Sequence, residues 1–201
     1  MAKLHFKYGA MNSGKSDTLI KTAYNYTERG LNVVTLKPSI DTKGGQTITA
    51  RGGATRIVDI LVAPETNIRD AIKAWQDEQG LEKIASILID ESQFLAEAQV
   101  DQLLQLAKLD GISVIAYGLR ADFRTKLFPG STRLLEIADN IEKLPTMCRC
   151  GNQAEFNTRK VDGEFVFEGD QVAIDGEGDV TYESLCGVCY LEEREKAGIV
   201  L

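Results

Sequence analysis

The first 119 residues alternate between two apolar patterns. Short apolar runs, or apolar side chains at every second position, are typical of strands and occur over residues 3–8, 31–38, 57–62, 84–91 and 112–119. Between them, apolar residues recur every three or four positions, as on one face of a helix, over residues 16–29, 65–80 and 95–111. Strands that alternate with helices predict an α/β fold whose parallel sheet is covered by helices on both faces.

Two segments depart from this alternation. Residues 39–56 are polar and rich in glycine, which predicts a flexible loop. After about residue 145 the chain has only short strand-like pieces, at 164–167 and 171–174, among Gly-Asp turns. We therefore predict a main domain over residues 1–145, a small second domain over 146–192 and a tail over 193–201.

The sequence "GAMNSGKS" fits the pattern G-x-x-x-x-G-K-[ST] of a phosphate-binding loop, or P-loop. It lies between a predicted strand and a predicted helix, where backbone N–H groups and the positive end of the helix can hold a triphosphate. Lys15 would reach the β- and γ-phosphates, and Ser16 would bind Mg²⁺. The alternative is a Gly-Ser turn without a ligand. The predicted ATP-binding residues here are Gly9, Ala10, Met11, Asn12, Ser13, Gly14, Lys15 and Ser16.

Two acidic residues, Asp90 and Glu91, end the apolar run over residues 84–91. In P-loop proteins an acid at this place holds Mg²⁺, and we assign that role to Asp90. Glu91 lies on the other side of the strand end and is the candidate general base. The alternative is a pair of solvated acids that opens a turn. We add Asp90, Glu91, Ser92 and Gln93 to the predicted ATP site.

All four cysteines lie in the second region, as C-x-C followed 35 residues later by C-x-x-C. Two close pairs far apart in sequence are typical of a tetrahedral Zn²⁺ site, and a site of four thiolates is closed and therefore structural. We predict zinc ligation by Cys148, Cys150, Cys186 and Cys189, in a domain that lacks a core of its own. A redox C-x-x-C motif is the alternative, although such motifs do not come with a second pair.

Charge and composition restrict the possible partners. The net charge of −7 argues against a nucleic-acid polymer as partner, since such proteins usually show a basic face. No apolar run approaches the roughly 20 residues of a membrane helix, and no secretory signal is visible. We therefore expect a cytoplasmic protein. The single histidine, His5, lies in a predicted strand, which disfavours a nucleophilic triad.

The order of these features resembles one enzyme family. A P-loop, then "DESQFL", then "YGLRADFRTKLF", then the four cysteines occur in the order found in type II thymidine kinases. The segments "YNYTERG", "YGLRADFR" and "CRCGNQAEF" resemble the bacterial branch. The resemblance covers nearly the whole chain. It implies transfer of the γ-phosphate of ATP to the 5′-hydroxyl of thymidine, and of deoxyuridine, in pyrimidine salvage, with Glu91 as base and Asp90 on Mg²⁺.

The resemblance also implies which residues hold thymidine. Phe94, Leu119 and Phe123 would enclose the base, and Met11 lies where the family packs the thymine methyl group. Residues 171–175 would grip the base through backbone groups, and residues 39–56, with Arg51, would cover the phosphates. The full set of implied thymidine contacts is Met11, Phe94, Leu119, Phe123, Phe128, Arg159, Gln171, Val172, Ala173, Ile174, Asp175 and Tyr182.

Some features of the family remain open for this chain. Asp175 stands where the family usually has glycine, and the loop around it is longer, so the backbone contacts to the base could be arranged differently. The resemblance further suggests a homotetramer inhibited by thymidine triphosphate. Two other functions stay open: a P-loop kinase for another nucleoside or small alcohol, and a nucleotide-gated, zinc-containing binding module.

Overall fold

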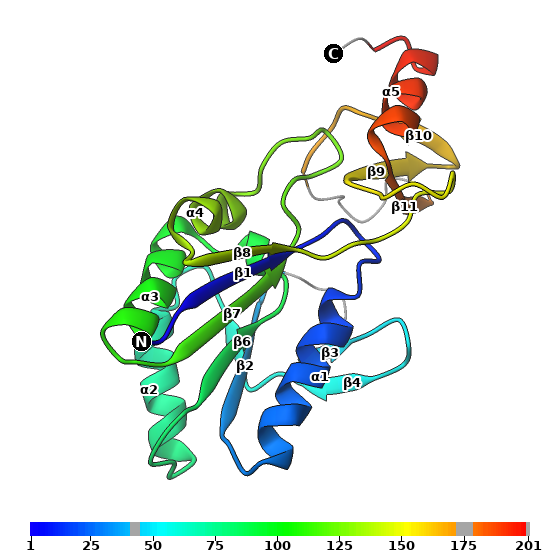
Figure 1. Ribbon diagram of the computed structural model, residues 1–201. Coiled ribbons are helices and arrows are strands. Elements are labelled where there is room, and N and C mark those ends of the chain that lie inside the picture. Colours follow the sequence, from blue (N-terminus) through cyan, green and yellow to red (C-terminus); the bar gives the residue numbers. More distant parts are fainter. Residues whose placement is uncertain (41–44, 172–178, 200–201) are drawn as a thin grey trace.

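A parallel sheet forms the centre of the molecule (Figure 1). The computed structural model describes residues 1–40, 45–171 and 179–199. Among these residues six strands pair in the order β5-β2-β6-β7-β1-β8, and every neighbouring pair is parallel. The predicted parallel sheet is therefore confirmed. Its strands are β1 (Leu4–Tyr8), β2 (Val33–Pro38), β5 (Ile60–Val62), β6 (Ser86–Ile89), β7 (Ser113–Gly118) and β8 (Asn140–Lys143).

Helices cover both faces of this sheet, as the apolar run at 84–91 predicts. On β6, Ile87 and Ile89 pack into one core with α2 (Ile68–Glu78), α3 (Glu97–Lys108) and α4 (Pro129–Ile137). Leu88, which points to the opposite face, packs with α1 (Lys15–Glu28) and with Ile48 of β3 (Thr47–Thr49). Figure 1 shows α1 on one side of the sheet and α2 to α4 on the other. The carboxyl ends of the strands are thereby fixed between two apolar layers.

Within residues 1–145, the described part of the structure differs from the predicted elements in three places. Residues 39–56 are not only a loop, because β3 pairs in antiparallel fashion with β4 (Thr55–Ile57) to form a hairpin. The strand predicted over residues 57–62 is divided between the end of β4 and β5. Helix α4 and strand β8 follow residue 119, where no element was predicted.

The C-terminal part contains a small sheet with a helix beside it. Strands β9 (Phe156–Val161), β10 (Glu164–Val166) and β11 (Val180–Leu185) pair in antiparallel fashion, followed by α5 (Gly187–Lys196). The expectation that this part lacks a core of its own is wrong. Phe156 stacks on Tyr190 with ring centroids 4.7 Å apart, and Phe167 meets Tyr190 edge-on. We refer to residues 146–199 as the C-terminal unit.

The helices do not resemble membrane spans. Within the described ranges, none combines the length and the apolar character that crossing a bilayer requires.

Candidate active site

The P-loop joins the end of β1 to the start of α1. Gly14 caps the helix with a φ of 73°, a conformation that an L side chain rarely adopts. A Cβ atom on Gly9 would lie 2.3 Å from Ser13 Oγ, so only glycine fits there. Asn12 also has a positive φ, of 69°. The glycines at positions 9 and 14 therefore allow the tight turn by which the chain enters α1.

Lys15 is buried within the loop rather than extended into solvent. Its Nζ donates hydrogen bonds to the carbonyl oxygens of Gly9, at 3.2 Å, and Ala10, at 3.0 Å. Burial lowers the pKa of Lys15, and the nearby carboxylates of Glu91 and Asp90 oppose this effect. An anionic phosphate in the loop would offset the cost of burying this ammonium group.

Ser16 and Asp90 place two oxygen groups side by side. Ser16, in the first turn of α1, donates to Asp90 Oδ2 at 3.3 Å, and the Asp90 side chain is almost completely buried. Burial, followed by repulsion from Glu91, raises the pKa of Asp90 to about 7. Oxygen ligands of this kind suit Mg²⁺, and a bound cation would favour the ionised carboxylate. The two residues therefore fit the predicted magnesium site.

Glu91 is held in a strained conformation beside Asp90. Its φ of 49° is unusual for a residue with a side chain, and it precedes the short 3-10 helix η1 (Ser92–Phe94). Gln93 donates from Nε2 to Glu91 Oε2, while its Oε1 accepts the Leu119 N–H at 3.0 Å. Because Leu119 uses the amide oxygen, the NH₂ group of Gln93 faces the carboxylate. Gln93 thus orients Glu91.

Close backbone packing keeps this arrangement in place. A Cβ on Gly118 would lie 2.7 Å from Ser92 Oγ and 2.8 Å from Gln93 Oε1, so glycine lets the end of β7 reach η1. Ser92 and Gln93 are themselves fully buried behind the carboxylate. Contact between ATP and these two side chains therefore stays a prediction.

The predicted thymidine residues fall into two groups. Phe94 and Phe128 meet edge-on, with ring centroids 5.6 Å apart. Phe123 lies beneath the Arg159 guanidinium, whose Cζ is 4.0 Å from the ring centroid and 5.7 Å from that of Tyr182. Leu119, Phe123 and Phe128 are buried, and Phe94 is half-buried. The predicted contacts Val172, Ala173, Ile174 and Asp175 lie outside the described residues.

Met11 is held by two residues that the sequence did not single out. Its N–H donates to Asn157 Oδ1 at 2.8 Å, and its carbonyl oxygen accepts a hydrogen bond from Ser184 Oγ. Asn157 also donates to the Ala121 carbonyl at 2.8 Å. Strands β9 and β11 therefore contact the P-loop directly. No local pattern could have identified these residues, because each lies more than a hundred positions from Met11.

Arg51 lies near the start of α1. It is exposed at the turn of the β3–β4 hairpin, and a Cβ on the next residue, Gly52, would lie 3.6 Å from Asp17 Oδ1. Asp17 belongs to the first turn of α1. The hairpin tip is thus close to the helix start, as a phosphate-covering role would require.

The four cysteines gather at one point of the C-terminal unit. Their Sγ atoms all lie within 4.8 Å of one another, and those of Cys150 and Cys186 are 3.6 Å apart. A tetrahedral Zn²⁺ with bonds of about 2.3 Å needs sulfurs about 3.8 Å apart, so the cluster fits this metal. Desolvation opposes ionisation of Cys148, but N–H groups of Cys150 and Cys186 and the neighbouring thiols together lower its pKa to about 7.

Comparisons with known proteins agree with these features. The family model described as thymidine kinase matches residues 2–190. The chain is 42% identical to a thymidine kinase of Haemophilus influenzae over 200 residues, 98% of this chain and 99% of that protein. It is 41% identical to one from Mannheimia succiniciproducens, over 98% of both chains, and 40% identical to one from Enterobacteria phage T4, over 98% of this chain and 100% of the other.

A comparison of folds adds little to this result. The crystal structure of the Pif1 helicase from Candida albicans overlaps 71% of this chain and 36% of its own, with 17% identity and a TM-score of 0.41. This likeness is too weak to support an argument. The match over residues 2–190 and the relatives of similar length are decisive, and the chain belongs to the thymidine kinase family.

Proposed function

We propose that this chain transfers the γ-phosphate of ATP to the 5′-hydroxyl of thymidine, giving ADP and thymidine 5′-phosphate. The observation that carries the proposal is the position of Glu91 and Asp90 beside Lys15 of the P-loop, in a member of the thymidine kinase family. A phosphate-binding loop and a carboxylate that can accept a proton are the two parts that such a transfer needs.

The residues from Gly9 to Ser16 would hold the triphosphate. N–H groups of the loop and of the first turn of α1 would face the phosphates, where the helix dipole favours an anion. Lys15 would leave the carbonyls of Gly9 and Ala10 and donate to phosphate oxygens instead. Ser16 and Asp90 would hold Mg²⁺, which neutralises charge on the β- and γ-phosphates when it is bound.

Glu91 would accept the proton of the sugar alcohol. As the 5′-oxygen forms its bond to the γ-phosphorus, its hydrogen moves to the Glu91 carboxylate, and the bond from the γ-phosphorus to the β,γ-bridging oxygen breaks to release ADP. The hydrogen bond from Gln93 would hold Glu91 in place before the nucleoside arrives. Positioning of this kind accounts for much of the catalysis in phosphoryl transfer.

The thymine base would lie against the apolar residues that follow the acid pair. These residues come from two segments: Phe94 follows β6, while Leu119, Phe123 and Phe128 follow β7. The hydrogen bond from the Leu119 N–H to Gln93 and the contact between Phe94 and Phe128 connect the two segments. A neutral, flat base needs aromatic contacts and backbone donors rather than a basic surface. This requirement is compatible with the net charge of −7.

Further properties are proposed on the resemblance to the family. The four-cysteine cluster would hold a structural Zn²⁺, which its spacing supports. A main domain over 1–145, a homotetramer, inhibition by thymidine triphosphate and a cytoplasmic location follow from the sequence resemblance and composition alone.

The test is formation of thymidine 5′-phosphate from ATP and thymidine by the purified chain, with other nucleosides and small alcohols compared at equal concentration. We expect thymidine to be the preferred acceptor, with deoxyuridine accepted. Preference for an unrelated alcohol would favour another kinase. ATP hydrolysis without any phosphorylated acceptor would favour a nucleotide-gated binding module.

A further inference from the structure

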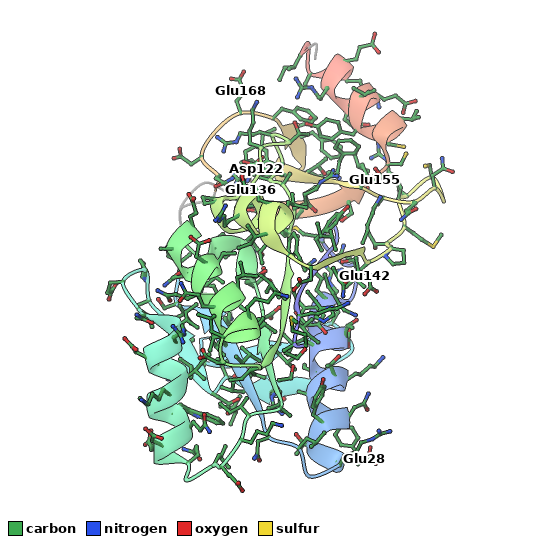
Figure 2. All side chains as sticks on the ribbon, turned by 60° about the vertical axis from the view of Figure 1, so that its left-hand side comes forward. Glu28, Asp122, Glu136, Glu142, Glu155 and Glu168 are labelled. Carbon is green, nitrogen blue, oxygen red and sulfur yellow. The ribbon has the colours of Figure 1, made fainter. Side chains whose placement is uncertain are left out.

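Asp122 is the centre of a hydrogen-bond network between the main sheet and the C-terminal unit. Its side chain is only 1% exposed, although it is the carboxylate of an ion pair. Oδ1 accepts the N–H groups of Arg124 and Lys126, each at 2.9 Å. Oδ2 accepts from Arg124 Nε and Nη2 and, at 3.2 Å, from Gln171 Nε2. Figure 2 shows Asp122 where the two parts of the molecule meet.

Two arginines hold the backbone of residues 169–171 from different segments. Arg124 Nη1 donates to the Gly169 carbonyl at 2.7 Å. Arg159, on β9, donates from Nη1 to the Asp170 carbonyl at 2.9 Å and from Nη2 to the Gln171 carbonyl at 3.1 Å. Three consecutive carbonyls thus accept hydrogen bonds from guanidinium groups, while the Gln171 side chain is bound to Asp122.

Arg159 also packs on Phe123, one of the aromatic residues proposed to enclose the thymine base. The Arg159 guanidinium lies over the Phe123 ring, at 4.0 Å, and its residue is 2% exposed. Its two terminal nitrogens are used by the Asp170 and Gln171 carbonyls. Arg159 is therefore built into the protein, because its terminal nitrogens and the face of its guanidinium contact protein groups. This geometry favours a positioning role over the direct thymidine contact that the family resemblance implies.

We propose that Asp122, Arg124 and Arg159 form a bracket that sets the spacing between residues 169–171 and the loop carrying Phe123. The three are positioning residues for a pyrimidine nucleoside, and the inference rests on the proposed function. Arg124 and Asp122, in the loop after β7, bind the Gly169 carbonyl and the Gln171 side chain. Arg159, on β9, binds the carbonyls of Asp170 and Gln171. A change in the bracket alters the spacing between residues 169–171 and the Phe123 ring, while the P-loop keeps its own hydrogen bonds with Asn157 and Ser184.

The test compares Arg159→Lys, Arg159→Gln and Arg124→Gln with Arg133→Gln as a matched control. Lysine keeps the charge at position 159 but cannot donate to two carbonyls from a planar group. Arg133, on α4, forms its ion pairs with Asp101 of α3 and Glu136 of α4 and with no residue of the bracket. For each variant KM for thymidine, KM for ATP, kcat and the thermal unfolding midpoint are measured, together with calorimetric binding of thymidine.

We expect KM for thymidine to rise about fivefold in Arg124→Gln and in Arg159→Lys, the effect of roughly one hydrogen bond, and further in Arg159→Gln. KM for ATP should stay near that of the unsubstituted chain, while the unfolding midpoint should fall in all three variants, because Asp122 or the carbonyls of residues 169–171 lose a donor. Unchanged KM for thymidine in all three variants would overturn the bracket. Parallel changes in both KM values would also overturn it, because they indicate general loosening. If the unsubstituted chain does not phosphorylate thymidine, the proposed function itself fails, and the inference fails with it.

Discussion

The geometry around Glu91 shows how a single residue can be prepared for chemistry. Its positive φ costs free energy, of the order of 1–3 kcal/mol for such conformations, and buried neighbours maintain it. Gln93 donates to its carboxylate, and Gly118 leaves the space that Gln93 needs. The carboxylate thus has a defined direction without being sealed in the core, since Glu91 is half-buried.

At this scale we predict that Glu91→Gln lowers kcat by about 10²- to 10⁴-fold, the usual contribution of a general base. Thymidine binding should be kept, because the new amide oxygen can still accept the Gln93 hydrogen bond. The measurements are steady-state kinetics and calorimetric titration with thymidine. Glu97→Gln, in the first turn of α3, is the matched control. Turnover close to the original in Glu91→Gln would mean that another group takes the proton.

The candidate site residues that the sequence singles out have local signals. Gly14, Lys15 and Ser16 follow a fixed spacing between a strand and a helix, and the structure has that strand and helix. Asp90 and Glu91 end an apolar run. Asn157 and Ser184 have no such pattern, because their shared partner, Met11, lies more than a hundred positions away. Asp122 bonds to Arg124 and Lys126 nearby, but its hydrogen bond from Gln171 spans 49 positions. Their roles could be recognised only from coordinates.

At the scale of elements, the contact between the small sheet and the P-loop is the most informative feature. Asn157 on β9 and Ser184 on β11 bind the N–H and C=O of one P-loop residue, Met11. Thr146 adds a hydrogen bond to the Asn12 carbonyl at 3.2 Å. The loop that would hold ATP is therefore shaped in part by strands far along the chain.

We predict that Asn157→Ala lowers the free energy of unfolding by about 1–3 kcal/mol, because the Met11 N–H and Ala121 C=O lose a buried partner. KM for ATP should rise as the loop loses its fixed shape. Denaturant unfolding and ATP-dependent kinetics measure the two effects. Asn140→Ala, which removes an exposed contact to the His5 ring, is the control and should change neither. Equal ATP kinetics in both variants would contradict the prediction.

The elements missed by the sequence are those with weak periodicity. Strand β8 carries one apolar residue, Ile141, and lies at an exposed edge, so it shows neither alternation nor an apolar run. Helix α5 is rich in charged residues, and its apolar residues form one run over 188–191 instead of recurring at helical spacing. The β3–β4 hairpin was not predicted, because its sequence is rich in glycine and threonine and has few apolar residues. Strands buried on both faces, such as β6, were predictable because burial requires a continuous apolar run.

At the scale of the whole molecule, the cysteine cluster brings together two distant segments of the C-terminal unit. Cys148 and Cys150 precede β9, while Cys186 and Cys189 lie at the start of α5. The aromatic core around Tyr190 packs against the same cysteines. The proposed zinc and the apolar packing would therefore stabilise one unit together, and this unit in turn contacts the P-loop.

We predict that removal of the metal, by a chelator or by Cys186→Ser, loosens the C-terminal unit and leaves the main sheet folded. Hydrogen exchange should accelerate by more than about tenfold in β9 and β11, and stay slow in β6 and β7. ATP binding should weaken as well. Re-addition of zinc to the chelated chain is the control and should restore protection. Unchanged exchange in β9 after verified metal removal would exclude a structural metal.

The two hydrogen bonds on Met11 have a consequence for the order in which the protein becomes functional. A ribosome makes Met11 173 positions before Ser184, so an emerging chain carries the nucleotide motif long before its supports exist. We expect a nascent or prematurely terminated chain to hold ATP poorly. Nucleotide capture would begin only once β9 and β11 have been made and have packed against the loop.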